Sequence, residues 1–181
     1  MRQGPNLKTT EMSWDQLFRR VMSQFCTGVV IVTSQDDSGP VGLTCQSFAS
    51  VSIDPPLVLF CPARSSTSWP QIRATGRFCV NVLGESQEAL SGKFAVSGGQ
   101  KFNDVEWAPG SLGAPRLRGA IAHVDCSLED VVPAGDHEIA IGRVWGLDHL
   151  EGEHPLLYFQ SHYTSARRSD VNRGAGDRVV Q

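Results

Sequence analysis

The chain of 181 residues lacks several features that mark common functional classes. Its formal net charge is −3, so it has none of the basic excess that nucleic-acid surfaces carry. No hydrophobic run approaches the length of a membrane span, and the first residues lack the basic-then-apolar order of a signal peptide. We therefore expect no nucleic-acid partner, no membrane partner and a cytoplasmic location.

Cysteine is scarce and scattered. The five cysteines form no CxxC pair, which leaves little support for a zinc site or a dithiol redox motif. We expect most of them to be small, buried apolar residues in a reducing compartment, and we predict no metal site.

Catalytic motifs are also missing. The sequence contains no GxSxG, HExxH or P-loop, and its five histidines show no ligand spacing with carboxylates. It has no GxGxxG either, so any dinucleotide it uses would not bind on a Rossmann turn. Many non-enzymes lack such motifs too, and their absence alone does not separate an enzyme from a binding protein.

Three segments carry the signals of helices. Ser13 followed by Gln16 predicts a capping box at a helix start. Behind it, apolar residues recur at three- and four-residue steps through residues 14–25, forming a stripe that must pack on another surface. Shorter helices are predicted over 68–75 and 86–95.

Strand signals are more numerous than helix signals. They are β-branched runs or period-two alternations, and they cover residues 29–33, 41–53, 57–61, 77–83, 120–132, 137–150 and 155–159. Most are linked by short turns such as 34–40 and 133–136, which favours an antiparallel barrel over a parallel α/β sheet. Residues 96–118, rich in glycine and proline, are predicted to be a loop.

The length fits one domain with a proper core. We expect that domain over residues 13–164. A flexible polar leader (1–12) precedes it, and a polar tail without periodicity (165–181) follows it.

Three polar stretches could be either structural or functional. Residues 42–52, GLTCQSFASVS, place small and hydroxyl side chains in a predicted strand, so this face meets either water or a polar ligand. Residues 61–69, CPARSSTSW, could cradle a phosphate with hydroxyls, amides and a guanidinium, or could only cap the next helix. The GDH sequence at 135–137 suits a hairpin turn, and could also place a histidine in a site.

Six segments in the same order resemble the flavin reductase domain family: FCTGVVIVTS, PVGLTCQSFASVSIDPPLVLFC, SSTSW, GRFCVNVL, KFAV with QKFNDVEW, and PAGDHEIAIGRV. The similarity runs from about residue 14 to 164. More narrowly, the chain resembles the small NADH:flavin oxidoreductase components of bacterial two-component flavin-dependent monooxygenases. This resemblance implies a mainly β fold with flanking helices, an FMN-binding split β-barrel with a Greek-key core, usually as a homodimer.

The resemblance also implies site residues, and a flavin along 42–52 would account for the small side chains there. Carried over position by position, the flavin-binding residues are Thr44, Cys45, Gln46, Ser47, Ser50, Cys61, Pro62, Ala63, Arg64, Ser65, Ser66, Ser68, Trp69, Phe94, Lys101 and Phe102. The same comparison places His137 and Tyr163 beside the nicotinamide. Arg64 does not choose between FMN and FAD.

The implied activity needs no catalytic side chain, because hydride passes directly from NADH or NADPH to FAD or FMN. Reduced flavin would then diffuse to a separate flavin-dependent oxygenase. Two alternatives stay open: a flavin-binding electron carrier or sensor that never uses nicotinamide, and a barrel oxidase acting on an organic substrate. The sequence offers no second anion site for the latter.

Overall fold

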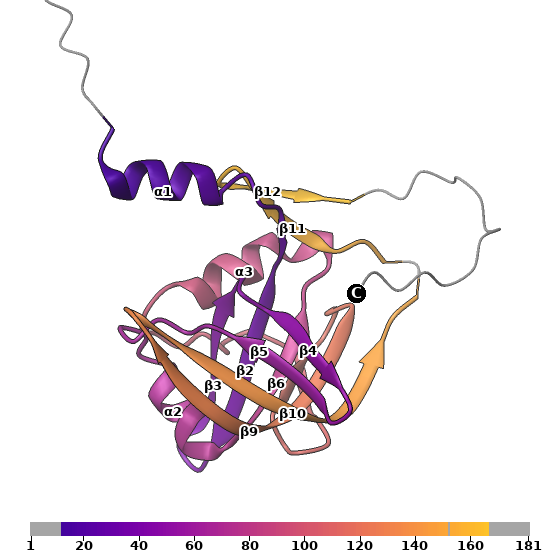
Figure 1. Cartoon of the computed structure of the whole chain (residues 1–181). Helices are drawn as coiled ribbons and strands as arrows, with labels where there is room; N and C mark the ends of the chain where they lie inside the picture. Colours follow the sequence, from indigo (N-terminus) through magenta and orange to yellow (C-terminus); the bar gives the residue numbers. More distant parts are fainter. Residues whose placement is uncertain (1–11, 152, 167–181) are drawn as a thin grey trace, which may run out of the picture.

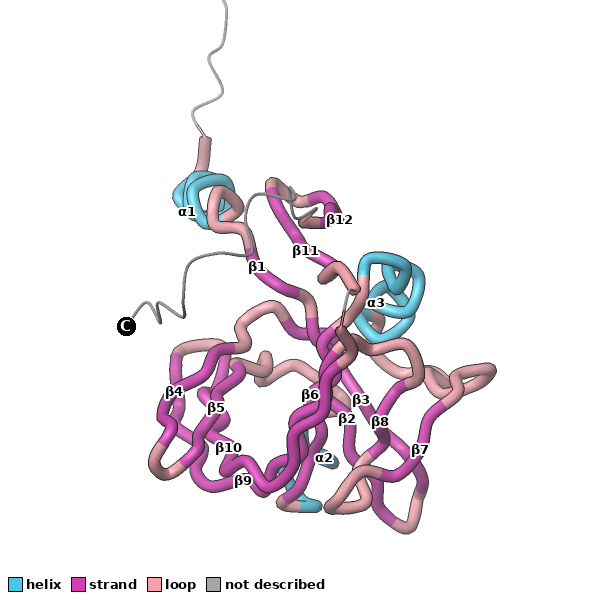
Figure 2. Tube along the Cα trace, turned by 90° about the vertical axis from the view of Figure 1, so that its right-hand side faces the viewer, coloured by secondary structure: helices cyan, strands magenta, loops and turns pink. Residues whose placement is uncertain are grey.

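Seven antiparallel strands form the body of the molecule, in a computed structural model that describes residues 12–151 and 153–166 (Figure 1). In spatial order they are β3 (Gly39–Cys45), β2 (Val30–Asp36), β6 (Arg77–Val82), β9 (Ala122–Ala134), β10 (His137–His149), β5 (Pro56–Phe60) and β4 (Ala49–Ile53). Figure 2 shows this sheet curling into a barrel. The predicted fold class, mainly β with flanking helices, is confirmed.

The prediction of one strand over 41–53 was wrong. Residues 46–48 are not in a strand, and the strands on either side of them, β3 and β4, are the two opposite edges of the sheet. The chain leaves one edge at Cys45 and joins the other at Ala49. The hydroxyl of Ser47 holds this crossing in place, because it accepts a hydrogen bond of 2.9 Å from the backbone N–H of Cys61.

The β-branched run at β2 serves two hydrophobic cores. Val30 and Val32 face the barrel interior, where Phe60 packs edge-on against Phe78 with ring centroids 5.2 Å apart. Ile31 faces the opposite way, into a second core beneath helix α3 (Glu88–Ala95). Both faces of the strand are therefore buried, which explains why it has no polar alternation.

Helix α2 (Trp69–Thr75) follows the polar 61–68 segment and packs on the barrel. It ends at Gly76, whose φ of 66° is the left-handed conformation that glycine adopts without strain. A short 3₁₀ turn, η1 (Glu85–Gln87), leads directly into α3, so the helix predicted over 86–95 is present.

A small sheet lies beside the barrel rather than in it. Strand β1 (Thr27–Gly28) pairs with β11 (Leu156–Phe159), which pairs with β12 (His162–Ser165). Strand β12 was not predicted, and it extends one residue past the expected domain boundary. Residues 167–181 of the expected tail, and residues 1–11 of the expected leader, lie outside the described residues.

Helix α1 (Trp14–Met22) has the predicted capping box at Ser13 and Gln16, yet no other described part of the chain buries any of its residues. Figure 1 shows it projecting away from the barrel. None of its residues is buried, and Trp14 is 76% exposed. Within residues 12–151 and 153–166, the apolar stripe therefore has no packing partner.

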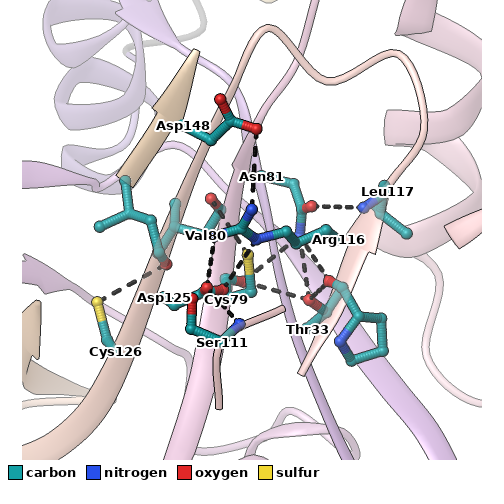
Figure 3. Close-up of polar contacts among 12 residues, drawn as sticks. Thr33, Cys79, Val80, Asn81, Ser111, Arg116, Leu117, Asp125, Cys126 and Asp148 are labelled. Atoms are coloured by element: carbon teal, nitrogen blue, oxygen red, sulfur yellow. Dashed lines mark hydrogen bonds and ion pairs between the residues drawn. The ribbon is translucent and has the colours of Figure 1, made fainter. Parts of the chain in front are cut away.

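The glycine- and proline-rich segment 96–118 was predicted to be a loop, and this prediction was only partly right. It contains a hairpin of β7 (Trp107–Pro109) and β8 (Pro115–Leu117). A buried polar network fastens this hairpin to the barrel (Figure 3). The fully buried Asp125 accepts hydrogen bonds from Arg116, at 2.6 Å, and from the N–H of Ser111, at 2.7 Å. These contacts depend on tertiary structure, and local sequence does not signal them.

Three of the five cysteines are buried, as predicted for most of them, and all five are free thiols. No helix in the described part of the chain is long and apolar enough to cross a membrane.

Candidate active site

A cleft of about 570 Å³ opens where the end of β3, the 61–67 segment and the end of α3 meet. The turn before β10 and the β11–β12 hairpin complete its walls. It is lined by Leu43, Thr44, Cys45, Gln46, Ser47, Cys61, Pro62, Ala63, Ser65, Ser66, Thr67, Phe94, Ala95, Val96, Ser97, Lys101, His137, Tyr158 and Tyr163.

Most residues named from the sequence line this cleft. The exceptions are Ser50, Arg64, Ser68, Trp69 and Phe102. Ser68 and Phe102 instead line a second cavity of about 410 Å³, which shares Thr67 and Lys101 with the cleft. Ser50 is exposed on the edge strand β4, and the side chain of Arg64 is exposed.

Trp69 points into the barrel rather than into the cleft. It is only 3% exposed, its ring packs edge-on against Phe60 at 5.5 Å, and its indole N–H donates to Glu138 at 2.6 Å. A role as a wall of the flavin site stays a prediction that this position does not favour.

Six lining residues were not named from the sequence: Leu43, Thr67, Ala95, Val96, Ser97 and Tyr158. Thr67 belongs to the hydroxyl-rich stretch 61–69, so the sequence could have predicted its place in the cleft. Tyr158 reaches the cleft because β11 pairs with β12, a contact that local sequence does not indicate.

Two hydroxyl groups of the 42–52 segment make hydrogen bonds within the protein. Thr44 donates its hydroxyl to the backbone carbonyl of Ser91, at 2.7 Å, which ties β3 to α3. Ser47 bonds the backbone of Cys61 and lies 3.0 Å from the sulfur of Cys45. These two hydroxyls shape the cleft wall and are not free hydrogen-bond donors for a ligand.

The segment 65–68 likewise divides its hydroxyls between structure and cleft. Ser66, rather than Ser68, accepts a hydrogen bond from the first backbone N–H of α2, at 3.2 Å from Trp69. Ser68 lies 3.2 Å from the ammonium of Lys101. In the described part of the chain, Ser65 makes no side-chain hydrogen bond and lines the cleft.

Among the described residues that line the cleft, Lys101 is the one lysine, and no arginine, aspartate or glutamate accompanies it. Its ammonium donates to the carbonyls of Gly42, at 3.1 Å, and Phe94, at 3.2 Å, as well as to Ser68. All three acceptors are uncharged, and no carboxylate of the described residues lines the cleft or the second cavity. Burial lowers the pKa of Lys101 from its ordinary value. An anion bound here would supply the missing counter-charge.

A glycine permits the close packing behind this ammonium. A Cβ on Gly42 would lie 2.8 Å from the ring of Phe94, a distance that real side chains do not tolerate. The bare backbone of β3 therefore lets Phe94 and α3 approach, and this approach sets the position of Lys101 between the two carbonyls.

His137 lies at the mouth of the cleft because its turn is docked on the 61–67 segment. The N–H of Arg64 donates to the carbonyl of Asp136, at 2.9 Å, and the N–H of Glu138 donates to the carbonyl of Pro62, at 3.0 Å. The imidazole Nδ1 is 2.8 Å from the carboxylate of Asp136. That hydrogen bond with His137 lowers the pKa of Asp136.

Tyr163 borders the opposite wall. Its hydroxyl is 2.9 Å from the hydroxyl of Ser91, and its ring stands edge-on to Tyr158 at 5.2 Å. The β11–β12 hairpin is thereby fixed to α3, with two aromatic rings facing the cleft. Within residues 12–151 and 153–166, no group of three or more His, Cys, Asp or Glu side chains could hold a metal ion.

Comparison with known proteins identifies the class. Residues 22–167 match the model of the flavin reductase like domain, and the chain belongs to that family. The predicted family is thereby confirmed.

Individual relatives are also close. The chain is 50% identical over 147 residues to HsaB, the reductase subunit of a flavin-dependent monooxygenase from Rhodococcus jostii, covering 81% of this chain and 75% of that protein. Nitrilotriacetate monooxygenase component B from Mycobacterium thermoresistibile superimposes with a TM-score of 0.84 at 45% identity, covering 91% and 92% of the two chains. The Streptomyces globisporus NADH:FAD oxidoreductase SgcE6, solved with NAD and FAD fragments, gives 0.80 at 33%, covering 86% and 93%.

Proposed function

We propose that this protein is the reductase component of a two-component flavin-dependent monooxygenase. It oxidises NADH or NADPH, reduces FAD or FMN, and releases reduced flavin to a separate oxygenase. The observation that carries this proposal is the cleft with an uncompensated lysine ammonium at one end and a docked histidine at its mouth, in a chain of the flavin reductase family.

The cleft fits a flavin. Its volume of about 570 Å³ lies within the range of roughly 300–1,000 Å³ that is usual for small-molecule sites. Small side chains such as Ala63 and Ser65 leave room for a flat ring. Lys101, with no acidic partner among the lining residues, matches a flavin phosphate. When bound, the flavin supplies the hydride acceptor, and the protein supplies position and charge.

His137 and Tyr163 would hold the nicotinamide beside that ring. Both side chains line the same cleft, and both are anchored by hydrogen bonds, to Asp136 and Ser91 respectively. Anchored groups lose little conformational freedom on binding, which favours the close approach of about 3–3.5 Å that hydride transfer needs.

We further propose that the protein is a homodimer, with α1 as part of the interface. The stripe exposes Trp14, Phe18, Val21 and Phe25 by 76%, 56%, 58% and 71%. Contiguous apolar surface of this kind marks interaction sites. A second copy offers the same unsatisfied face, as a two-fold interface requires. Light scattering should give twice the monomer mass at micromolar concentration, and Phe18→Asp should yield monomer.

The five free thiols suit a reducing compartment, and we place the reaction in the cytoplasm. Fractionation of the native host, with the activity following the cytoplasmic fraction, tests this placement.

The activity is tested by mixing the purified protein with NADH and either FAD or FMN, and following absorbance of the nicotinamide. We expect NADH oxidation that requires flavin and continues in air. Binding of flavin without NADH oxidation would instead indicate an electron carrier or sensor. NADH oxidation that proceeds equally without added or bound flavin would rule out the proposal.

A further inference from the structure

The β11–β12 hairpin, which carries both tyrosines of the cleft wall, ends in an unfavourable turn. Phe159 pairs with His162, so Gln160 and Ser161 form a two-residue loop. Their φ angles are 48° and 65°, in the left-handed region that residues with a side chain rarely adopt. Two-residue hairpin loops with positive φ at both positions strongly prefer Asn-Gly or Gly-Gly. The sequence Gln-Ser therefore does not by itself favour this turn.

The turn is instead held by the end of helix α1, beside which it lies (Figure 1). The backbone N–H of Gln160 donates to the carbonyl of Ser23, the C-cap of α1, at 2.9 Å. The side-chain amide of Gln160 donates to the side-chain carbonyl of Gln24, also at 2.9 Å. In the described part of the chain, these two hydrogen bonds are the ones that join the turn to another element.

Strand β1 supports the hairpin only as far as Tyr158. It pairs with β11 at Leu157 and at Tyr158, and these two pairs end before the turn. Tyr158 and Tyr163 form the cross-strand pair next to the turn, and both line the cleft. A displacement of the turn would therefore move the cleft wall directly.

We infer that Gln160 is a positioning residue for the nicotinamide wall. By binding the end of α1, it holds the unfavourable turn and thereby places Tyr163 in the cleft. Gln160 is exposed and is not among the residues that line the cleft, so it acts through the hairpin and not on a substrate. This inference rests on the proposed function, in which Tyr163 borders the nicotinamide.

The test measures KM and kcat for NADH, at saturating flavin, in variants that break the contact with α1. Gln24→Ala and Gln160→Ala each remove one amide of the pair, and each should raise KM about threefold, the scale of one net hydrogen bond at an exposed position. The double variant should be no worse than either single one, because both remove the same bond. The value of kcat and the affinity for flavin should stay within about 1.5-fold, because the contact affects the binding of NADH alone.

A matched control lies on the same hairpin. Thr164 is exposed on β12, away from the turn and outside the cleft lining, so Thr164→Ala should keep the KM of the wild type.

A turn that needs no external support should rescue the loss. Gln160→Asn with Ser161→Gly installs Asn-Gly, which adopts positive φ at both positions readily. Added to Gln24→Ala, which has no amide to bind, these changes should return KM to within about 1.5-fold of the wild type. A contact that only stabilised the fold would not give this rescue of KM.

Unchanged KM in both Gln24→Ala and Gln160→Ala would overturn the inference, as would a raised KM that the Asn-Gly turn does not restore. Easier unfolding in urea with the KM of the wild type would show that the contact only stabilises the fold, and would overturn it too. In a Tyr163→Ala background, Gln160→Ala should add nothing to KM. A further threefold rise there would mean that Gln160 does not act through Tyr163. A wild type that oxidises no NADH in the presence of flavin would contradict the proposed function itself, a result seen before any variant is compared.

Discussion

Two half-buried cations, Arg116 and Lys101, differ in whether a carboxylate lies beside them. Arg116, on the β7–β8 hairpin, bonds the fully buried carboxylate of Asp125 at 2.6 Å and has Asp148 at 3.8 Å (Figure 3). Lys101, between the cleft and the second cavity, has three acceptors in the described part of the chain, and all of them are uncharged. One charge is compensated by the protein, and the other is not.

The pKa shifts follow this difference. The hydrogen bond to Asp125 raises the pKa of Arg116, so the fold stabilises its charge. Burial lowers the pKa of Lys101, so the fold opposes its charge. A buried charge that the fold does not stabilise costs free energy. Arg116 therefore belongs to the structural network, and the surroundings of Lys101 agree with the proposed role of this residue in binding a ligand.

The largest expected effect is on the structural pair. Asp125→Ala leaves the guanidinium of Arg116 without its main partner and the N–H of Ser111 without its acceptor. Breaking a buried pair in this way costs about 3–5 kcal/mol, and the partial exposure of Arg116 favours the lower end. Urea unfolding of the flavin-free protein measures this loss in the free energy of unfolding. A loss below about 1 kcal/mol would mean that the network does not hold the hairpin.

Lys101→Met should weaken ligand binding and leave the stability of the fold intact, the opposite of Asp125→Ala. Losing a charge-assisted contact of about 1.5–3 kcal/mol weakens FMN binding by roughly ten- to a hundredfold. Riboflavin, which lacks the phosphate, should bind nearly as before. Stability should stay level or rise, because the substitution removes a half-buried charge that has no carboxylate partner among the described residues. Lys93→Met, on α3 outside both linings, is the control. Equal losses for FMN and riboflavin would place the phosphate elsewhere.

This contrast also separates what the sequence could predict from what it could not. Strand positions followed from β-branched runs and turn residues, and the hydroxyl-rich segment 61–67 does line the cleft. These signals are local. The crossing at 46–48 was not predicted, because Gln46, Ser47 and Phe48 include neither glycine nor proline, and only the sheet order shows that β3 and β4 are opposite edges.

The isolation of Lys101 could not be predicted either. Whether a charge is compensated depends on which carboxylates the fold brings near it, and those come from distant segments. Asp125 reaches Arg116 across the hairpin, whereas Lys101 meets the carbonyl of Gly42. The inward orientation of Trp69 could not be predicted for the same reason. Trp69 begins helix α2, and its partners Phe60 and Glu138 lie on the distant strands β5 and β10.

A smaller effect is expected at the mouth of the cleft. His137→Ala removes an imidazole that Asp136 orients, and it should lower kcat/KM for NADH about tenfold, the worth of one net hydrogen bond. Affinity for flavin should change little, because Lys101 and the 61–67 segment are untouched. Stopped-flow reduction of bound flavin over a range of NADH concentrations measures both quantities. Asp136→Asn keeps the ring and tests the orienting bond. Wild-type kinetics in His137→Ala would show that His137 has only a structural role in the turn.

The smallest expected effect is a pH dependence that only the uncompensated cation should show. An ordinary lysine titrates near pH 10.4, and burial lowers the pKa of Lys101 below its usual value, so its charge is lost at lower pH than that of a surface lysine. Bound phosphate favours the charged form and opposes this loss. Affinity for FMN should therefore begin to fall at a lower pH than an ordinary lysine would allow, while affinity for riboflavin follows only the ionisation of the flavin itself. Lys101→Arg keeps its charge throughout and should abolish the difference between the two flavins' pH profiles. Parallel profiles for FMN and riboflavin in the wild type would show that the ammonium does not contact the phosphate, and the distinction drawn between Lys101 and Arg116 would then fail.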